Sequence, residues 1–370
     1  MIILQNADVQ QVLDMRTCLN ALEEGFKDYT HQSGGDRPNI SVWAPCDRMD
    51  GYYRLSDMEG VSGSTKTYAI RIKSDILYWT ADGTEEKYCV RPGSYCGLIM
   101  LFSIANGAPL AILQDGYLQH MRVGACAGLG VKYLAREDSK TLGILGSGGM
   151  ARTYLQAISA VRHLEAVKVY SPTVAHREEY AAEMKEMTGL SVIPVRSIEE
   201  AIINSDIVAT CTDSTKEVVT NPAWIRPGMH LTNLRGPREW SPQIFDRADL
   251  VFRTGPFWDA WGFSGLPAFI RNVVGQPHEI SRIHEWAAFF GKRETLHDEL
   301  YKKKKPSHLV DLVSSKVTGR RNAGEVSFFT PHGLSGLQFA AVAGAVYRLA
   351  TERRLGTHLP EHLFLQEIRD

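Results

Sequence analysis

The sequence lacks the features that mark several classes of protein. It has six cysteines among 370 residues, but no C-x-x-C pair and no histidine cluster at zinc spacing, so neither a disulfide framework nor a metal site is predicted. Neither sign of charge dominates, because 41 lysines and arginines face 42 acidic residues. This balance argues against a nucleic-acid partner or a polybasic membrane contact. No run approaches about 18 uncharged apolar residues, so no membrane span is expected.

The first residues also lack the basic start and the long apolar run of a signal peptide. We expect the six cysteines to be reduced and mostly buried, which together with the missing signal predicts a cytoplasmic protein. The length suggests two domains, with a core large enough to need no disulfide or metal for stability.

What the sequence does contain is an alternation of strand-like and helix-like segments between about residues 140 and 252. Six apolar runs, from "TLGILG" to "ADLVFRT", predict a parallel sheet, and six strands complete a doubly wound domain. Before about residue 125, strand-like runs alternate with Gly, Asp and Asn turns, including a hairpin signal at Asn106-Gly107, and predict a mixed or antiparallel sheet. The predicted fold class is α/β, a doubly wound Rossmann domain plus an α+β domain.

A glycine cluster follows the first strand of the alternating region. Its residues fit the pattern G-x-G-x-x-A and are Gly146, Ser147, Gly148, Gly149, Met150 and Ala151. The first glycine permits a tight turn, the second lets the backbone approach a pyrophosphate, and the small last residue lets helix and strand pack closely. The helix that follows turns its free N–H groups toward the phosphates. A strand before the cluster and a helix after it favour a dinucleotide site over a chance glycine turn.

The end of the second strand bears on the choice of coenzyme. NAD-binding folds usually place an acidic residue there to bind the ribose 2′-OH, whereas this chain has Ser171, Thr173 and Arg177. The absence of a carboxylate favours NADP(H), and NAD(H) stays possible if Arg177 is only a solvated helix residue. Thr212 and Asn233, on the fourth and fifth predicted strands, are further candidate coenzyme contacts.

Longer stretches around these residues resemble one known family. "VGACAGLGVKYLAREDSKTLGILGSGGMA", "VKVYSPT", "ANGAPLAILQDGYLQHMR", "GMHLTNLRG" and "LVSSKVTGRRNAGEVSFFTPHGL" are similar in order and spacing to the ornithine cyclodeaminase/mu-crystallin family, over about residues 53–349. The resemblance implies a homodimer of two-domain subunits. Residues 1–125 and 320–370 would form a substrate-binding and dimerisation domain. Residues 126–319 would form a Rossmann domain that binds NAD(P), with an insertion at about residues 255–306.

The same resemblance points to residues that hold a substrate carboxylate. Family members use a lysine on an N-terminal strand and an arginine in the helix before the nucleotide fold, and Lys73 and Arg122 match these positions. A fork of donors grips a carboxylate in two places. Lys66 is a rival for the lysine, and Arg54 is a second candidate contact. The alternative for each is an ordinary surface ion pair.

One departure separates this chain from the cyclodeaminases of the family. They carry an aspartate just after the fifth strand, where this chain reads "NLRGPREW". Glu239 lies in this stretch, as either a catalytic or a structural residue. Reductase members also lack the aspartate, so the resemblance favours an NAD(P)H-dependent oxidoreductase acting on C=N or CH–NH bonds, which reduces an imino acid to an amino acid. His332 is a candidate proton source and Lys73 a candidate proton relay.

Two alternatives stay open. One is an amino-acid dehydrogenase or a cyclodeaminase, and the other is a non-catalytic NADPH-binding protein like the crystallin branch of the family. Lys73 and Arg122 favour an enzyme, because a pure binder needs no carboxylate clamp. The expected ligand is a small imine or amino acid with a carboxylate.

Overall fold

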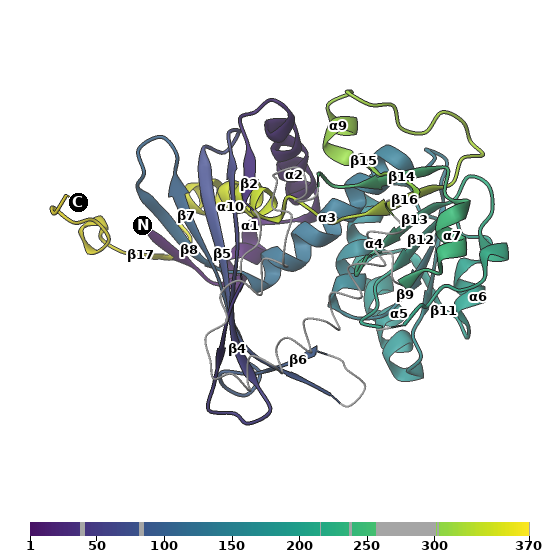
Figure 1. The fold of residues 1–370 in the computed structure, drawn as a ribbon, viewed down its shortest axis with the longest axis horizontal. Helices are drawn as coiled ribbons and strands as arrows, with labels where there is room; N and C mark the ends of the chain where they lie inside the picture. The colour runs from purple at the N-terminus through teal and green to yellow at the C-terminus, as the bar shows by residue number, and fades with distance from the viewer. Residues whose placement is uncertain are drawn as a thin grey trace.

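The computed structural model describes residues 1–37, 41–80, 85–214, 216–236, 239–256, 301 and 303–369. Two β-sheets stand on either side of the molecule, and the long helix α3 (Gly116–Leu134) runs from one to the other (Figure 1). We call them the mixed sheet and the parallel sheet. This arrangement confirms the predicted α/β class with two differently built parts.

The mixed sheet has the strand order β17-β1-β8-β7-β5-β4-β2, with β3 paired to β4 and β6 paired to β5. Its strands are β1 (Ile2–Leu4), β2 (Gly35–Arg37), β3 (Ser41–Pro45), β4 (Tyr52–Ser62), β5 (Thr67–Trp79), β6 (Glu85–Tyr88), β7 (Cys96–Ser103), β8 (Pro109–Gln114) and β17 (Thr357–His358). All pairs are antiparallel except β1 with β8. The predicted hairpin joins β7 to β8, and Gly107 has the left-handed conformation (φ +77°) that such a turn requires.

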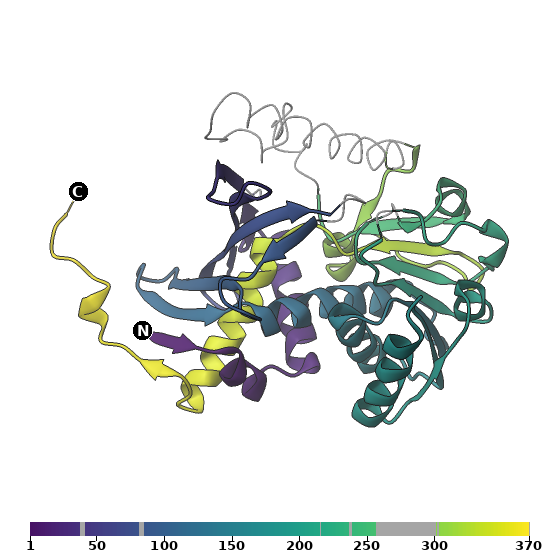
Figure 2. The ribbon, with the colours of Figure 1, turned by 90° about the horizontal axis from the view of Figure 1, so that it is seen from below.

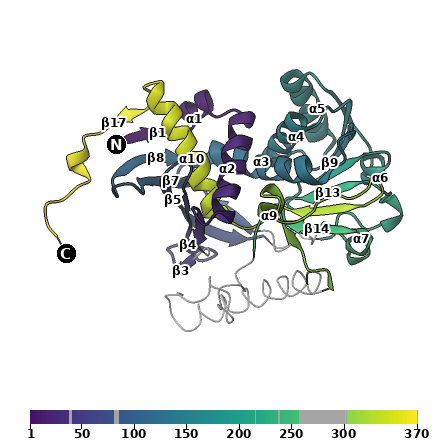
Figure 3. The same ribbon diagram turned by 90° about the horizontal axis from the view of Figure 1, so that it is seen from above.

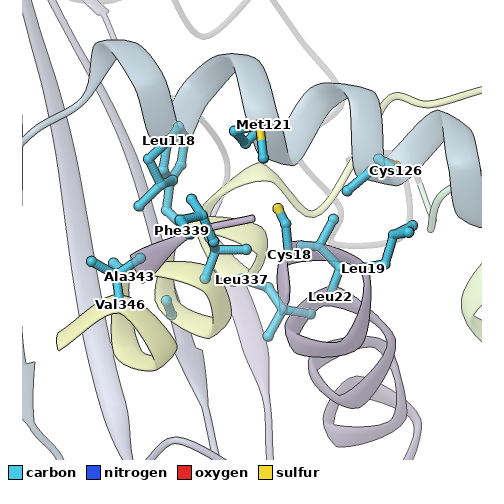
Figure 4. Packing of buried hydrophobic residues seen from close by; sticks show 14 of the residues in the cluster. Cys18, Leu19, Leu22, Leu118, Met121, Cys126, Leu337, Phe339, Ala343 and Val346 are labelled. Carbon is cyan, nitrogen blue, oxygen red and sulfur yellow. The ribbon is translucent and has the colours of Figure 1, made fainter. Parts of the chain in front are cut away.

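Helices from both ends of the chain pack on one face of this sheet. They are α1 (Asn6–Val12), α2 (Met15–Thr30) and α10 (Ser335–Glu352), which lie close together in Figures 2 and 3. Figure 4 shows Leu22 of α2, Met121 of α3 and Phe339 of α10 in the core that they share. Each of these three side chains is at most 1% exposed. The first half of α3 is thereby fixed to the mixed sheet.

The parallel sheet has the order β11-β10-β9-β12-β13-β16-β14-β15, and every pair in it is parallel. Its strands are β9 (Thr141–Leu145), β10 (Ala166–Tyr170), β11 (Ser191–Pro194), β12 (Ile207–Thr210), β13 (His230–Asn233), β14 (Leu250–Arg253), β15 (Ser307–His308) and β16 (Ser327–Thr330). The helical segments that follow them are α4 (Gly149–Val161), α5 (Val174–Thr188), α6 (Ile198–Ile202), η1 (Pro222–Trp224), α7 (Pro242–Arg247) and α9 (Leu309–Val313), whereas η5 (Glu361–Leu363) follows β17 of the mixed sheet. The six predicted strands are confirmed in Rossmann order, with β16 inserted before the last of them.

The C-terminal part of the chain contributes to both sheets. β16 lies between β13 and β14, so the prediction that residues 320–370 belong wholly to the other domain is wrong. All four residues of β16 are buried, and a strand buried on both faces needs a neighbour on each side to satisfy its backbone. α3 likewise crosses the predicted boundary near residue 125. The predicted insertion at about residues 255–306 lies almost entirely outside the described residues.

All six cysteines are free thiols, of which Cys18, Cys126 and Cys211 are buried and Cys89 is exposed.

Within the described ranges, no helix combines the length and apolar character needed to cross a membrane. In the same part of the chain, no three His, Cys, Asp or Glu side chains gather as they would around a metal ion.

Candidate active site

The turn after β9 has a shape that only glycine fits. Gly146 has φ +110°, and its N–H donates to the Tyr170 carbonyl oxygen at 2.8 Å. A Cβ atom there would lie 2.3 Å from the Cys211 carbonyl oxygen, which follows the neighbouring strand β12. Both the backbone conformation and the space therefore require the first glycine of the predicted motif.

Beyond this turn, exposed backbone leads into α4. Gly148 is the N-cap of α4, and a Cβ atom on it would meet nothing within 4 Å. No side chain caps this thirteen-residue helix, so its first N–H groups and its positive end are available to an anion. Ala151 is fully buried, and its carbonyl accepts a hydrogen bond from the Tyr180 hydroxyl at 2.9 Å. The turn thus fits the pyrophosphate of a dinucleotide.

Arg152, which the sequence analysis did not single out, fixes this turn. Its Nη1 donates to the Ser147 carbonyl at 2.8 Å. Its Nε lies 2.9 Å from both carboxylate oxygens of Glu183 on α5, and its Nη2 is 2.5 Å from one of them. The guanidinium therefore ties the carbonyl of the turn to the neighbouring helix.

The residues predicted to face the ribose gather where β10 ends. Ser171 is buried, and Thr173 is exposed at the N-cap of α5. Arg177 donates from Nη1 to the Ser171 carbonyl at 3.0 Å, and its guanidinium carbon lies 6.0 Å from the Tyr170 ring centroid. Arg177 consequently reaches back to the end of the strand, where a ribose phosphate would lie in a Rossmann fold.

Thr212 and Glu239 form a closed hydrogen-bonded unit beyond β12. Glu239 is fully buried, and its Oε1 accepts from the Thr212 hydroxyl at 2.6 Å and the Thr212 N–H at 3.2 Å. Its Oε2 accepts from the Thr210 hydroxyl at 2.8 Å and the Arg235 N–H at 3.2 Å. Four donors occupy this carboxylate, so the geometry favours the structural role of Glu239 over the catalytic one.

Asn233 and His332 hold together the ends of β13 and β16. Asn233 is fully buried, and its Nδ2 donates to the Thr330 hydroxyl at 3.1 Å. His332 Nε2 lies 3.0 Å from the Leu234 carbonyl oxygen. Because a carbonyl only accepts, Nε2 carries the hydrogen in this bond. His332 thus lies at the coenzyme edge of the sheet, but a proton transfer from Nε2 would break this contact.

A charged cluster lies on the core-facing side of β5. Arg71, Lys73 and Asp75 alternate along the strand and therefore share one face, and Arg54 on β4 is directly opposite Asp75. Asp75 is buried, and its Oδ2 lies 3.0 Å from Lys87 Nζ, 3.3 Å from Arg54 Nη2 and 3.7 Å from Lys73 Nζ. The predicted residues Arg54 and Lys73 thus share one carboxylate.

The pKa of Lys73 is unusually low for a lysine. Burial is the main cause, followed by the positive charges of Lys87 and Arg71, and together they lower the pKa of Lys73 to about 7 although Asp75 opposes them. Burial works against ionisation of Asp75 as well, but Lys73, Lys87 and Arg54 outweigh it and hold the pKa of Asp75 below its usual value. Near neutral pH, Lys73 is therefore able both to bind and to release a proton.

Arg71 is a buried cation that the sequence analysis missed. It is 4% exposed, and its Nε and Nη2 donate to Asp115 Oδ2 at 2.7 and 2.5 Å. Its guanidinium carbon lies 5.2 Å from the ring centroid of Phe339, and that of Arg122 lies 4.8 Å from the same ring. Two arginines from distant parts of the chain therefore lie beside the same phenyl ring.

Arg122, the candidate carboxylate ligand on α3, is buried at 6% exposed. It donates to the side-chain oxygen of Gln119, at 2.8 Å from Nη2, and to that of Gln338, at 3.2 Å from Nη1. Burial and the nearby charge of Arg71 lower the pKa of Arg122 to about 10, so it remains charged at neutral pH. Across the described residues, Arg122 forms no salt bridge.

Lys66, the alternative to Lys73 as the substrate-binding lysine, lies at a distance from the charged cluster. Lys66 is exposed in the turn before β5, with φ +55°. Since a strand rises about 3.3 Å per residue, it is roughly 20 Å from Lys73 along the sheet. Lys66 is therefore not part of the charged cluster.

Helix α3 connects the charged cluster on β5, called the cation cluster below, to the turn that begins at Gly146, called the phosphate turn below. Arg122 belongs to the cluster, and His120, two residues earlier, touches Gly149, since a Cβ atom on that glycine would lie 2.9 Å from the imidazole Cε1. α3 and α4 approach closely at Gly124, where a Cβ atom would lie 2.5 Å from the Thr153 carbonyl oxygen. This close packing fixes the distance between the two parts of the site.

Several known proteins are similar to this chain in sequence or in fold. Δ(1)-Pyrroline-2-carboxylate reductase of Bacillus cereus is 36% identical over 135 residues, and this match spans 36% of the present chain and 41% of that protein. Alanine dehydrogenase of Archaeoglobus fulgidus is 24% identical over 97% of this chain and 98% of its own. The structure of Δ(1)-pyrroline-2-carboxylate reductase of Thermococcus litoralis with NADH and L-proline shares the fold, with a TM-score of 0.72 at 24% identity over 97% of this chain and 100% of that one.

The family model described as ornithine cyclodeaminase/mu-crystallin matches residues 1–353, which is nearly the whole chain. The matched range includes the Gly146 turn, the charged cluster on β5, helix α3 and the C-terminal elements β16 and α10. The chain therefore belongs to the ornithine cyclodeaminase/mu-crystallin family.

Proposed function

We propose that the chain is an NAD(P)H-dependent oxidoreductase that reduces the C=N bond of an imino acid. The observation that carries this proposal is the buried guanidinium of Arg122, whose hydrogen bonds go to the uncharged amides of Gln119 and Gln338. A buried cation without a counter-charge is costly. A substrate carboxylate would supply the missing anion in a bidentate contact. The likeness to two Δ(1)-pyrroline-2-carboxylate reductases supports this substrate class.

The side chains divide the work of the reaction. A reduced nicotinamide coenzyme, held by its pyrophosphate at the Gly146 turn, would supply the hydride. Arg122 and Arg71 hold the substrate carboxylate and so orient the C=N carbon toward the coenzyme side. Lys73, with a pKa of about 7, exchanges a proton at the substrate nitrogen. His332, at the edge of the parallel sheet, is a second candidate for this proton.

An amino-acid dehydrogenase is the second candidate, because the chain resembles an alanine dehydrogenase over almost its whole length. The same carboxylate clamp would serve the oxidation of a CH–NH bond, which is the reverse reaction. The cyclodeaminase alternative has less support, since this chain has no aspartate in the stretch after β13 where cyclodeaminases carry one.

For the coenzyme we propose a preference for NADP(H). Arg177 reaches the end of β10, and no carboxylate occurs between Tyr170 and Arg177 to repel a 2′-phosphate. The structures of three proteins that share the fold contain NADH, NAD or NAD+. A direct comparison of the two coenzymes therefore decides this point.

We also propose a cytoplasmic homodimer. On the face of β5 turned away from the helices, Ile70, Ile72 and Ile76 are only half-buried, and Leu98 on β7 is 37% exposed. Apolar side chains in such a patch favour contact with a second copy. An archaeal alanine dehydrogenase that shares the fold is a dimer. The six free thiols are typical of a reducing compartment, and light scattering in solution measures the subunit number.

The activity is tested by following oxidation of NADPH or NADH with a panel of substrates. The panel contains cyclic imino acids and 2-oxo acids with and without ammonia or methylamine. We expect turnover with an imino acid, and with an oxo acid only when the amine is present. Reduction of NADP by an amino acid alone would favour the dehydrogenase. Tight coenzyme binding without turnover across the panel would contradict both and leave a binding protein.

A further inference from the structure

The phosphate turn has a neighbour with no task in the reaction described above. His120 on α3 is exposed, and its ring lies against the first residue of α4. A Cβ atom on Gly149 would be 2.9 Å from Cε1 and 3.3 Å from Nδ1 of this imidazole. The ring thus occupies the space next to Gly149 that a side chain would otherwise take.

The imidazole of His120 also has unused hydrogen-bonding capacity. Among the described residues, neither of its ring nitrogens has a hydrogen-bond partner. The N-terminal N–H groups of α4 that lie beside it are equally without a capping side chain. The imidazole and the uncapped N–H groups therefore lie side by side at the N-terminus of α4, which is the end of a helix that attracts an anion.

We propose that His120 is a ligand of the coenzyme's pyrophosphate, which it binds as an imidazolium together with the N-terminal turn of α4. This inference rests on the proposed coenzyme-binding function and extends it to a side chain outside the glycine motif. It gives the phosphate site one charged donor from α3, in addition to the backbone donors of α4.

The charges around His120 make its ionisation sensitive to a bound anion. Although His120 is exposed, the protein atoms around its ring partly desolvate it and lower the pKa of His120, and the carboxylate of Asp115 partly opposes this. Asp115 is itself held by Arg71, and Arg152 on α4 is held by Glu183 on α5. A negatively charged pyrophosphate beside the ring favours the protonated form. Coenzyme binding near neutral pH is therefore coupled to proton uptake at His120.

The alternative is that His120 only fills space beside Gly149. The two roles differ in what they predict for charge, because a packing residue has no reason to take up a proton. They also differ for the change Gly149→Ala, which would push the ring away from the turn. If His120 binds the phosphate, Gly149→Ala should weaken coenzyme binding more in the wild-type background than in His120→Ala.

The experiment measures coenzyme affinity and proton uptake in the intact protein. Titration calorimetry with NADH and NADPH, in buffers of different ionisation enthalpy, is carried out on the wild type, His120→Gln and the control His163→Gln. His163 is exposed beyond the C-terminal end of α4.

We expect His120→Gln to bind both coenzymes roughly tenfold to hundredfold more weakly at about pH 6.5, with a smaller loss at high pH and without the proton uptake of the wild type. His163→Gln should match the wild type. Thermal unfolding measures whether each variant is folded. If His120→Gln does not fold, the double-mutant cycle of Gly149→Ala and His120→Ala takes its place. Unchanged affinity or unchanged proton uptake in a folded His120→Gln would overturn the inference, whereas a wild type that binds neither coenzyme would overturn the proposed function itself.

Discussion

The parallel sheet and the mixed sheet contribute to the candidate site in different ways. The parallel sheet offers mainly backbone, in a turn of a few residues that begins at Gly146 and leads into α4. The mixed sheet offers side chains, in a cluster assembled from β4, β5, α3 and α10. A backbone site depends on local conformation, whereas a side-chain cluster depends on how distant segments pack. The following changes separate the two contributions.

The largest effect is expected for Gly146→Ala in the backbone site. The new Cβ atom would lie 2.3 Å from the Cys211 carbonyl oxygen, and φ would stay near +110°, so the start of α4 must move. We expect coenzyme affinity to fall at least about a hundredfold, measured by fluorescence titration with NADPH.

Gly189→Ala is the matched control for this change. Gly189 also has positive φ (+71°), but a Cβ atom there meets nothing within 4 Å. It should cost only about 1 kcal/mol of stability and leave coenzyme affinity unchanged. If both variants lost affinity equally, the fit of the turn around the phosphate would not be the cause.

Arg122→Met tests the side-chain cluster. Loss of two charge-assisted hydrogen bonds to the substrate, about 1.5–3 kcal/mol each, predicts a fall in kcat/KM of at least about a hundredfold. Because Arg122 is buried among uncharged partners, its removal should not lower the unfolding temperature. Steady-state kinetics and calorimetric melting measure the two quantities, with coenzyme affinity expected to stay the same.

Arg348→Met on the exposed side of α10, where Arg348 pairs with Glu352, provides the comparison. It should change neither kinetics nor stability appreciably. An Arg122→Met protein that keeps its kcat/KM would remove Arg122 from the substrate site.

A smaller effect is expected from the titration of Lys73. Below pH 7 both the folded and the unfolded chain bind its proton, and the cost of burying the charge is fully present. Between the folded pKa of about 7 and the ordinary value of 10.5, only the unfolded chain binds the proton, so stability rises with pH through this window. The stability difference between wild type and Lys73→Met should therefore shift in favour of the wild type from pH 7 to 10 in denaturant titrations.

The same acidity makes Lys73 reactive toward acylating reagents near neutral pH. Lys140, whose pKa is raised by its hydrogen bond to Glu165, should react only at higher pH and is an internal standard. Equal labelling of both lysines at pH 8, read by peptide mass spectrometry, would argue against a depressed pKa at Lys73.

The smallest effect is expected for Arg177→Ala, which touches only the outer end of the coenzyme site. The variant should bind NADPH about tenfold more weakly, because one contact to the 2′-phosphate is lost. Its affinity for NADH should be unchanged. A loss that is equal for both coenzymes would mean that Arg177 acts through the Ser171 carbonyl, to which it donates, and not through the phosphate.

The local structure of the candidate coenzyme site could be predicted from the sequence because its signals are local. Strand, glycine turn and helix follow one another directly, and the observed order β9, Gly146 turn, α4 is the predicted one. For the substrate half, the family resemblance suggested Lys73 and Arg122 but not Arg71, although strand alternation puts Arg71 on the same face as Lys73. His120 and Arg152 were missed because nothing in a single sequence indicates which helix residue will touch a distant turn.

The order of residues along the chain was sufficient for the Rossmann alternation, the hairpin at Gly107 and the need for a bare backbone at Gly146, since each depends on neighbouring residues and their φ and ψ angles. Packing was needed to insert β16 between β13 and β14 and to surround Glu239 with four donors. It was also needed to bring Arg71 and Arg122 to the same ring of Phe339. The pKa values of Lys73 and Arg122 are lowered by burial and by neighbouring positive charges. Both causes depend on tertiary structure, because they arise only when the helices from both ends of the chain pack on the mixed sheet.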